Sequence, residues 1–289
     1  MPTRAREPFA VWTRDDSGYP AALRQVPRAP ARLWTRGDRA TLDVAAVAIV
    51  GTRRASPYGV AMARRVGRTL ARSGACVLSG LAAGIDAAAH AGALSVGGRT
   101  CAALGTGIDV VFPFAHAALQ ERIATDGLLV SQFPPGTEAF KFNFPKRNAL
   151  IATLARAVIV IEAPVKSGAL ITVRAARSLG RTVAVVPGPI DQSAHAGSNA
   201  LLREPDVVAI TSAEDALALI GARLAESDPP PDLGPDAAKV WDALAAGPAD
   251  VDALTVRAHL PATRCLAALT TLELAALITC DATGEVRRA

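Results

Sequence analysis

The 289-residue sequence is poor in cysteine, histidine and aromatic residues, and each shortage argues against a class of protein. Its four cysteines stand at least fifteen positions apart without a CxxC pair, so neither a disulfide framework nor a zinc site is expected. Its four histidines are scattered, and neither HExxH nor GxSxG occurs. No apolar run approaches the roughly twenty residues of a membrane span, and the Arg-containing start lacks a secretory signal. We therefore expect a cytoplasmic protein with no membrane partner.

Charge is scarce but unevenly distributed. About half of the residues are hydrophobic (51%), which is enough for a sizeable core, and the formal net charge is only +5. Residues 1–45 carry +3 and residues 46–222 carry +6, whereas residues 223–289 carry −4. The front and middle of the chain would therefore attract a polyanion.

From residue 46 onward, short Val, Ile, Leu and Ala runs alternate with amphipathic helical stretches. This alternation predicts parallel βαβ units, and the nearly continuous apolar runs indicate a sheet covered on both faces. We expect strands at residues 47–51, 75–79, 100–104, 128–131, 157–161, 182–186 and 207–210. The predicted fold class is α/β: an extended Rossmann-like, doubly wound and mostly parallel sheet.

Changes in composition predict four regions. Residues 1–45 form a short proline-punctuated segment packed on the main domain of residues 46–222, and residues 223–235 form a proline-rich and acidic linker. Residues 236–289 show three helical stretches and a short β tail, the order of a small winged-helix domain. Its last helical stretch offers only Arg264 as a cation, so protein contact is favoured over reading a DNA groove.

The loops after the strands are where a doubly wound sheet binds its ligand. Here they include "GTRRASPYG", "SGLAAGID" and "EAPVKSGALIT", which combine Gly, Ser and Thr with Arg and Lys. Such loops suit close approach of the backbone to phosphates. Ser79, Gly80 and Lys166 are candidates on this ground.

The sequence contains no complete motif for binding a nucleotide cofactor. The first turn is Gly51-Thr52-Arg53 rather than GxGxxG, and the second strand ends at Ser79 where an acid would hold a ribose. Lys166-Ser167 lacks the glycine spacing of a Walker loop. We therefore predict neither a cofactor nor a metal.

Catalytic acids are also few. Asp86 and His90 stand four residues apart on a predicted helix, where a structural role is favoured over catalysis. Glu162 ends the fifth predicted strand and is the best lone acid, although a helix cap or loop hydrogen bond explains it better. We predict no catalytic residue and no enzyme.

The stretch "KFNFPKRNALIATLA" instead favours binding. Arg53 at a strand end, and Lys141, Lys146 and Arg147 ahead of a helix, are expected to bracket a phosphate backbone, with Phe144 or Phe142 stacked on a base. In an extended segment the two rings would point the same way. The alternative is that the rings belong to the core and the cations are merely solvated.

Several motifs in order resemble the DNA-processing protein A family (DprA, also called Smf). They are "SGLAAGIDAAAHAGALSVGGRTCAALGTGIDVVFP", "SQFPPGTEAFKFNFPKRNALIA", "SGALITVRAARSLGRTVAVVPGPID" and "GSNALLREP". The resemblance covers residues 19 to about 221, and the tail from about residue 236 is similar to the family's winged-helix domain. It implies a homodimer that binds and protects single-stranded DNA without catalysis and loads RecA during natural transformation.

The resemblance also assigns DNA-binding residues, and in one place this chain departs from it. They are Gly51, Thr52 and Arg53, then Lys141, Phe144, Pro145, Arg147 and Asn148, then Ser167, Gly168 and Thr172. Many members continue Arg-Asn-Arg, but Ala149 follows Asn148 here and removes one cation. Two alternatives stay open: an enzyme similar to the Rossmann-like nucleotide phosphoribohydrolases, although their PGGxGTxxE motif is missing, and a nucleotide-sensing module.

Overall fold

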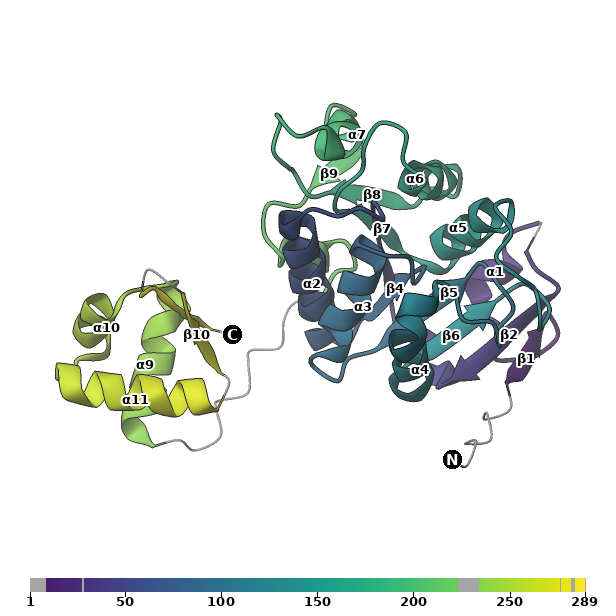
Figure 1. Cartoon of the computed structure of the whole chain (residues 1–289). Coiled ribbons are helices and arrows are strands. Elements are labelled where there is room, and N and C mark those ends of the chain that lie inside the picture. Colours follow the sequence, from purple (N-terminus) through teal and green to yellow (C-terminus); the bar gives the residue numbers. More distant parts are fainter. Residues whose placement is uncertain (1–8, 28, 223–233, 276, 282–283, 289) are drawn as a thin grey trace. The chain divides into compact units, whose positions relative to one another are not determined.

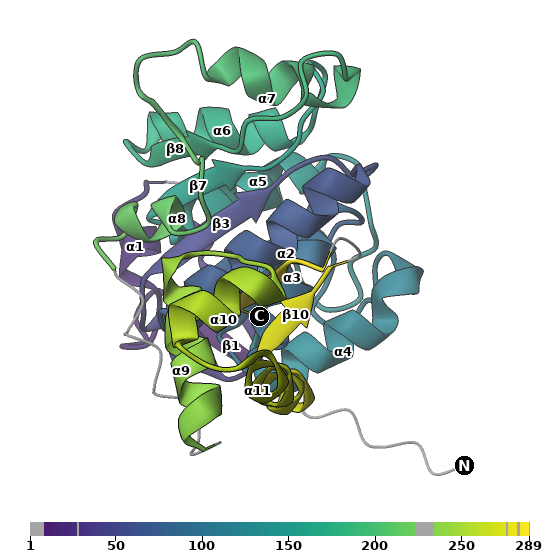
Figure 2. The same ribbon diagram turned by 90° about the vertical axis from the view of Figure 1, so that its left-hand side faces the viewer.

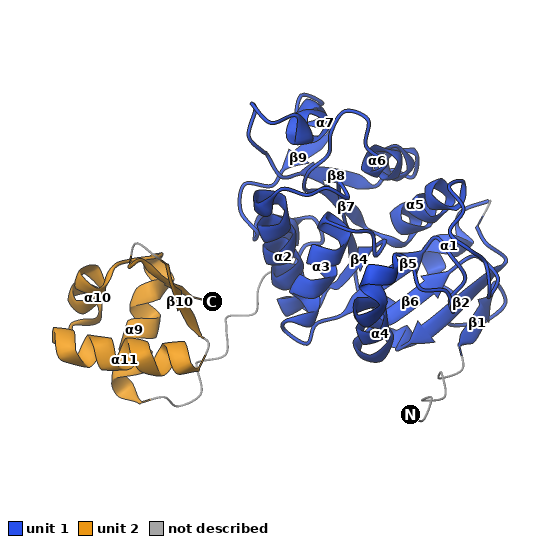
Figure 3. Cartoon of the chain, in the orientation of Figure 1, with its two compact units in different colours: residues 1–224 blue, residues 225–289 orange. Residues whose placement is uncertain are grey.

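The structure is a computed structural model that describes residues 9–27, 29–222, 234–275, 277–281 and 284–288. The chain divides into two compact units, residues 1–224 and residues 225–289 (Figure 3). Most of the predicted linker at residues 223–235, and residues 1–8 of the predicted N-terminal segment, lie outside the described residues. None of the helices in the described ranges combines the length and apolar character needed to cross a bilayer.

One sheet organises the first unit, and nine strands form it among the described residues. They are β1 (Ala10–Thr13), β2 (Arg32–Gly37), β3 (Ala46–Val50), β4 (Cys76–Ser79), β5 (Thr100–Leu104), β6 (Leu128–Ser131), β7 (Ala157–Val160), β8 (Thr182–Val185) and β9 (Val207–Ala209). Strands β3 to β9 agree with the seven predicted strands to within one residue. The pairings of these seven strands with one another are all parallel, which confirms the α/β fold class.

Strand order creates the crevice that matters for function. The order is β1-β2-β6-β5-β4-β3-β7-β8-β9, so the chain winds one way from β3 to β6 and the other way from β7 to β9 (Figure 1). Helices that follow β3 and β7 therefore diverge, and a ligand site is expected beyond their carboxyl ends. Strands β1 and β2, which the sequence analysis did not predict, extend the sheet through an antiparallel β2–β6 pairing.

Helices cover both faces of the sheet because alternate strand residues point to opposite sides. In β3, Ala48 and Val50 belong to one apolar cluster, whereas Val47 and Ile49 belong to another. The first cluster packs under α1 (Ala21–Arg24), α5 (Asn143–Leu154), α6 (Ala169–Ser178) and α7 (Ala196–Leu201). The opposite face carries α2 (Pro57–Arg72), α3 (Ile85–Leu94), α4 (Ala117–Asp126) and α8 (Asp215–Ala218) (Figures 1 and 2).

Helix α2 shows how local sequence sets these boundaries. Ser56 caps its N-terminus by accepting a hydrogen bond from Gly59 N at 3.0 Å, and Pro57 occupies the first turn, where its missing N–H costs nothing. Apolar Ala63, Val66 and Leu70 recur at helical spacing and are buried. The helix therefore begins at Pro57 and packs its apolar face against the sheet.

The second unit has its own apolar core, formed by residues between Ala237 and Val286. It contains α9 (Pro235–Ala243), α10 (Val251–Ala258), α11 (Ala262–Leu274) and the hairpin of β10 (Ile278–Cys280) and β11 (Val286–Arg288). Three helices followed by a two-stranded wing confirm the predicted winged-helix fold.

Candidate functional site

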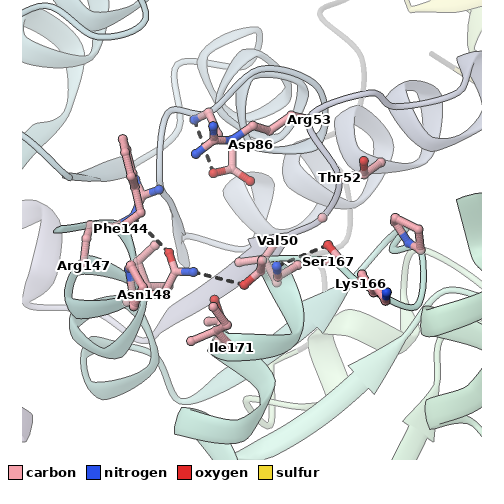
Figure 4. A pocket seen from close by; sticks show the side chains of 18 of the residues that line it. Val50, Thr52, Arg53, Asp86, Phe144, Arg147, Asn148, Lys166, Ser167 and Ile171 are labelled. Carbon is pink, nitrogen blue, oxygen red and sulfur yellow. Dashed lines mark hydrogen bonds between the residues drawn. The ribbon is translucent and has the colours of Figure 1, made fainter. Parts of the chain in front are cut away.

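A pocket of about 360 Å³ lies at the reversal of strand order, beyond the ends of β3 and β7. Its walls come from the turn after β3, the first turns of α5 and the segment that leads into α6 (Figure 4). Ten of the fourteen residues that the sequence predicted line it: Gly51, Thr52, Arg53, Phe144, Arg147, Asn148, Lys166, Ser167, Gly168 and Thr172. Thr172 lines it with a side chain that is only 1% exposed.

The turn after β3 is held close to the sheet. Thr52 N donates to the carbonyl oxygen of Glu162 at 2.7 Å, which ties the turn to the end of β7. A Cβ on Gly51 would fall 2.5 Å from Ile85 Cγ1 and 2.8 Å from that same carbonyl oxygen. Glycine is therefore required for close packing here, and the turn brings Arg53 to the mouth of the pocket.

Arg53 and Phe144 form the most suggestive pair in the pocket. Arg53 is exposed, and its Cζ lies 5.0 Å from the centroid of the half-buried Phe144 ring. This is a cation–π distance, and it places the guanidinium over the ring. In such a pair the ring can stack on a base, and the exposed cation beside it can contact a phosphate.

Arg147 plays a different part from the one predicted. It is only 4% exposed, and its Nη1 donates to the carbonyl oxygens of Ala103, at 2.9 Å, and Gly80. A Cβ on Gly80 would collide with this guanidinium. Burial is the main reason that the pKa of Arg147 falls to about 10, and Asp86 opposes that fall. The structure thus corrects the expectation of a surface cation ahead of a helix: Arg147 is inside α5 and braces the pocket wall.

The N-terminus of α6 points its first turn at the pocket. The N-cap of α6 is Gly168, which has no side chain to accept a hydrogen bond. The first turn carries no acid. Asn148 links the two walls, because its Oδ1 accepts from Arg147 Nε at 3.1 Å while its Nδ2 donates to the carbonyl oxygen of Gly168 at 3.2 Å. Ser167 Oγ accepts from Ala169 N at 3.3 Å. The positive end of the helix dipole therefore faces the pocket next to exposed Lys166.

Charges in the pocket are predominantly positive. Arg53, Arg54 and Lys166 take part in no ion pair within the described ranges of the chain, and all three are exposed. Asp86 is the pocket's acid, and its Oδ2 accepts from Gly80 N at 3.1 Å and from Ala82 N at 3.3 Å. Burial raises its pKa above the ordinary value, although Arg147 works against this.

Four predicted residues lie outside this pocket. Ser79 is fully buried and donates to the carbonyl oxygen of Ile49 at 2.6 Å, so it cannot reach a ligand. Gly80 lines a neighbouring cavity of about 220 Å³. Lys141 and Lys146 are exposed but line neither cavity.

The two phenylalanines also differ from expectation. The segment is not extended, since Phe142 caps α5 and Phe144 is in its first turn. Positions two apart on a helix lie on nearly opposite sides of its axis, about 200° around it, and the rings therefore point apart. Phe144 enters the pocket, whereas Phe142 is 61% exposed outside it.

The candidate catalytic acids have structural partners. Glu162 is fully buried, and its carboxylate accepts from Ser56 Oγ at 2.7 Å and from Ser56 N at 3.1 Å. It therefore serves as a cap for α2, the alternative already favoured by its sequence position. His90 Nδ1 lies 2.7 Å from Thr100 Oγ1 and does not meet Asp86. In the described ranges, no three His, Cys, Asp or Glu side chains gather as metal ligands would.

Sequence reasoning missed two contributors to the site. Arg54 lines the main pocket beside the predicted Arg53 and was overlooked although it is adjacent in sequence. Phe112 lines the neighbouring cavity, and its ring centroid lies 5.6 Å from that of Phe144. It belongs to the loop "GTGIDVVFP" after β5, so a search of every strand end for rings would have found it.

Comparisons with known proteins find matches for both units of the chain. Residues 10–221 match the family described as DNA recombination-mediator protein A, and residues 225–282 match the DprA winged helix domain. A putative DNA processing protein DprA of Mycobacterium tuberculosis is 39% identical over 284 residues, covering 94% of this chain and 73% of the relative. The DNA processing protein DprA of Streptococcus pneumoniae is 41% identical over 203 residues, covering 70% and 71%.

Two solved structures have the same fold. The X-ray structure of DprA from Streptococcus pneumoniae aligns with a TM-score of 0.70 and 40% identity, covering 73% of this chain and 74% of that one. The structure of DNA processing protein A from Helicobacter pylori aligns with a TM-score of 0.66 and 30% identity, covering 74% and 96%. That structure was reported for its single-stranded DNA binding mode.

Proposed function

We propose that this chain, which belongs to the DNA recombination-mediator protein A (DprA) family, binds single-stranded DNA in the pocket beyond the ends of β3 and β7. One observation carries the proposal: Arg53, Arg54 and Lys166, which form no ion pair among the residues that the structure describes, line a pocket whose wall includes the Phe144 ring. The Helicobacter pylori relative with a solved structure has a single-stranded DNA binding mode, which supports the same ligand here.

A single strand suits this pocket better than a duplex does. Bases in a duplex are stacked and paired inside the helix, whereas an unpaired strand can insert a base into a concave site and stack it on an aromatic ring. Phosphates on either side of such a base would meet Arg53 and the first turn of α6. Because these contacts read no base edge, binding is expected to depend little on sequence.

The acids of the site support binding rather than catalysis. The Asp86 carboxylate is engaged by two backbone N–H groups, and the Glu162 carboxylate is engaged by Ser56 outside the pocket. A general acid or base must be within reach of a substrate proton. We therefore assign the pocket no catalytic step.

The wider role we propose is that of a recombination mediator. It would protect incoming single strands in the cytoplasm and load RecA on them during natural transformation, acting as a homodimer. Family membership supports this role. The loading role is measured by the growth of RecA filaments on single strands that this protein coats. Growth no faster than on bare strands would contradict the role.

Replacing Arg53 tests the site. Arg53→Ala is expected to weaken single-strand binding about tenfold or more, since a hydrogen bond to a charged group contributes about 1.5–3 kcal/mol. Fluorescence anisotropy at several salt concentrations should also show a shallower salt dependence, because one phosphate contact is lost. The fold should persist, because the exposed side chain fills no core.

Arg99→Ala is the matched control. Arg99 is an exposed arginine that precedes β5, at the opposite edge of the sheet, and it lines neither cavity. Equal affinity in Arg53→Ala and Arg99→Ala would reject the proposed site.

Two other results would favour the alternative functions. Free base released from nucleoside monophosphates would favour an enzyme, and displacement of DNA by mononucleotides would favour a nucleotide sensor.

A further inference from the structure

An aromatic pair lies just outside the pocket, at the start of α5. The rings of Phe140 and Phe142 are stacked, with centroids 5.4 Å apart and planes 5° from parallel. The two side chains are 47% and 61% exposed. Lys146 Nζ lies 5.5 Å from the centroid of the Phe142 ring, and Lys141 stands exposed between the two phenylalanines in the sequence. We call these four residues the aromatic platform.

Packing does not explain the aromatic platform. Single exposed apolar side chains are common on protein surfaces and call for no explanation. Two parallel rings accompanied by two lysines are a different case, because they keep a large apolar area in water next to positive charge. Ring faces of this kind stack on bases, and nearby lysines attract the phosphates between them.

Helix α5 supplies a second observation that points to an anion. Its N-cap, Phe142, provides no side-chain hydrogen bond, and no acid stands in its first turn. The partial positive charge of the helix N-terminus is therefore left without an acidic partner at the same place as Lys141 and Lys146.

The aromatic platform is continuous with the pocket along the chain. Phe142 is two residues before Phe144, which lines the pocket. Two steps of about 3.8 Å keep their Cα atoms within about 8 Å of each other. A strand leaving the pocket over the first turn of α5 would therefore meet the Phe140–Phe142 pair directly.

We propose that the aromatic platform is a second base-stacking subsite for the single strand as it leaves the pocket. This inference rests on the proposed function and extends it from one pocket to a two-part site. Affinity should therefore rise with oligonucleotide length, with a step where the strand becomes long enough to reach Phe142. Lys141 and Lys146, which lie outside the pocket, would contact the phosphates of this outer part.

The test is a series of oligothymidylates from about two to about twelve nucleotides, titrated against the full chain by anisotropy. Phe142→Ala is expected to remove the step and to weaken the longest oligonucleotide about fivefold to a hundredfold, the effect of losing one stacked base. Phe142→Tyr should restore the step because it keeps the ring, whereas Phe142→Leu should not. Fluorescence of Phe142→Trp should be quenched more by long oligonucleotides than by short ones.

Phe9→Ala is the control, since Phe9 is 40% exposed and precedes the edge strand β1. It should bind every length as the unaltered protein does. If the unaltered protein binds no single strand, the proposed function itself fails. If it binds and Arg53→Ala weakens it, while Phe142→Ala keeps the step, only the subsite is overturned.

Three further results would also overturn the subsite. Equal loss at every length in Phe142→Ala would make Phe142 part of the pocket. Full affinity in Phe142→Leu would indicate an apolar contact without stacking. Unchanged DNA binding with a weakened contact to RecA or to a second copy would make the aromatic platform a protein-docking surface.

Discussion

At the scale of single residues, two arginines of the pocket differ in their exposure to solvent. Arg53 is exposed over the Phe144 ring, so its charge reaches a ligand at little desolvation cost. Arg147 is almost wholly buried, and its guanidinium donates hydrogen bonds to backbone carbonyl oxygens. Burying a charge is unfavourable unless hydrogen bonds compensate, and here they do. Arg53 is therefore the arginine that we propose binds DNA, whereas Arg147 contacts Asn148 and the Phe144 ring from inside the wall.

His90 makes the folded state sensitive to acid. Burial is the main cause that lowers its pKa from 6.5 to about 3. Between these two values the unfolded chain binds the proton and the folded chain does not, so the free energy of unfolding decreases as pH falls through this window. We expect a loss of up to about 1.4 kcal/mol per pH unit below pH 6, measured by urea unfolding.

His90→Asn provides the comparison, because an amide can still bond to Thr100 but does not titrate. Its stability should change less steeply with pH than that of the unaltered protein. The raised pKa of Asp86 acts in the opposite direction, since the folded state then holds its proton more tightly, but Asp86 is present in both proteins and cancels in the difference. Identical slopes would show that His90 does not control this dependence.

At the scale of elements, Glu162 couples the end of β7 to the start of α2. Its buried carboxylate accepts hydrogen bonds from the backbone N–H and the hydroxyl of Ser56, the N-cap of that helix. Glu162→Gln keeps one acceptor oxygen but loses the charge. We expect it to lower the free energy of unfolding by about 1–3 kcal/mol, measured by urea unfolding, and to leave single-strand affinity nearly unchanged.

Ser56→Ala is the companion variant. It removes the hydroxyl from the same cap and should cost about 1 kcal/mol, less than Glu162→Gln, because the buried carboxylate keeps the backbone N–H. Because both variants act on one cap, their effects should not add in the double variant. A loss of DNA binding at full stability in Glu162→Gln would contradict a purely structural role for the acid.

Helix α5 begins earlier than the sequence suggested. A residue before proline usually avoids the helical region, which favours an extended reading of the segment around Pro145. The structure starts α5 at Asn143 and places Pro145 in its first turn, where the missing N–H is not needed. This start separates Phe142 from Phe144 and so creates an inner and an outer ring.

At the scale of the whole molecule, the two units are electrically opposite. Residues 1–224 contain 26 Lys and Arg against 16 Asp and Glu, whereas residues 225–289 contain five against ten. In the second unit, Arg264 of α11 is held by Asp236 through two hydrogen bonds of 2.5 and 2.6 Å. The cation that the sequence offered for groove contact is therefore already paired.

A chain that ends at residue 224 tests whether the first unit alone binds single-stranded DNA. The second unit has its own apolar core, so its removal should leave the first unit folded. All the residues proposed to contact DNA are in the first unit, and single-strand affinity should stay within about threefold of the full chain. Anisotropy and circular dichroism measure the two properties, and a loss of more than tenfold in a folded fragment would assign DNA contact to the winged helix.

Sequence alone determined the seven strands from β3 to β9 and the edge of the sheet where the candidate site lies. Apolar runs at the period of strands and helices report burial locally, so β3 to β9 could be located to within one residue. Strand ends could be searched because parallel strands share an edge, and this found Gly51, Arg53, Phe144 and Lys166. The family followed from motifs in order.

Only the tertiary structure decided which side chains are free. Ser56 and Glu162 are 106 positions apart, and no local pattern shows that they form one cap. The burial of Arg147 and the pairing of β2 with β6 likewise depend on contacts between distant segments. A residue's type sets what it can do, but its neighbours in space set its exposure and its hydrogen bonds, and these come from packing.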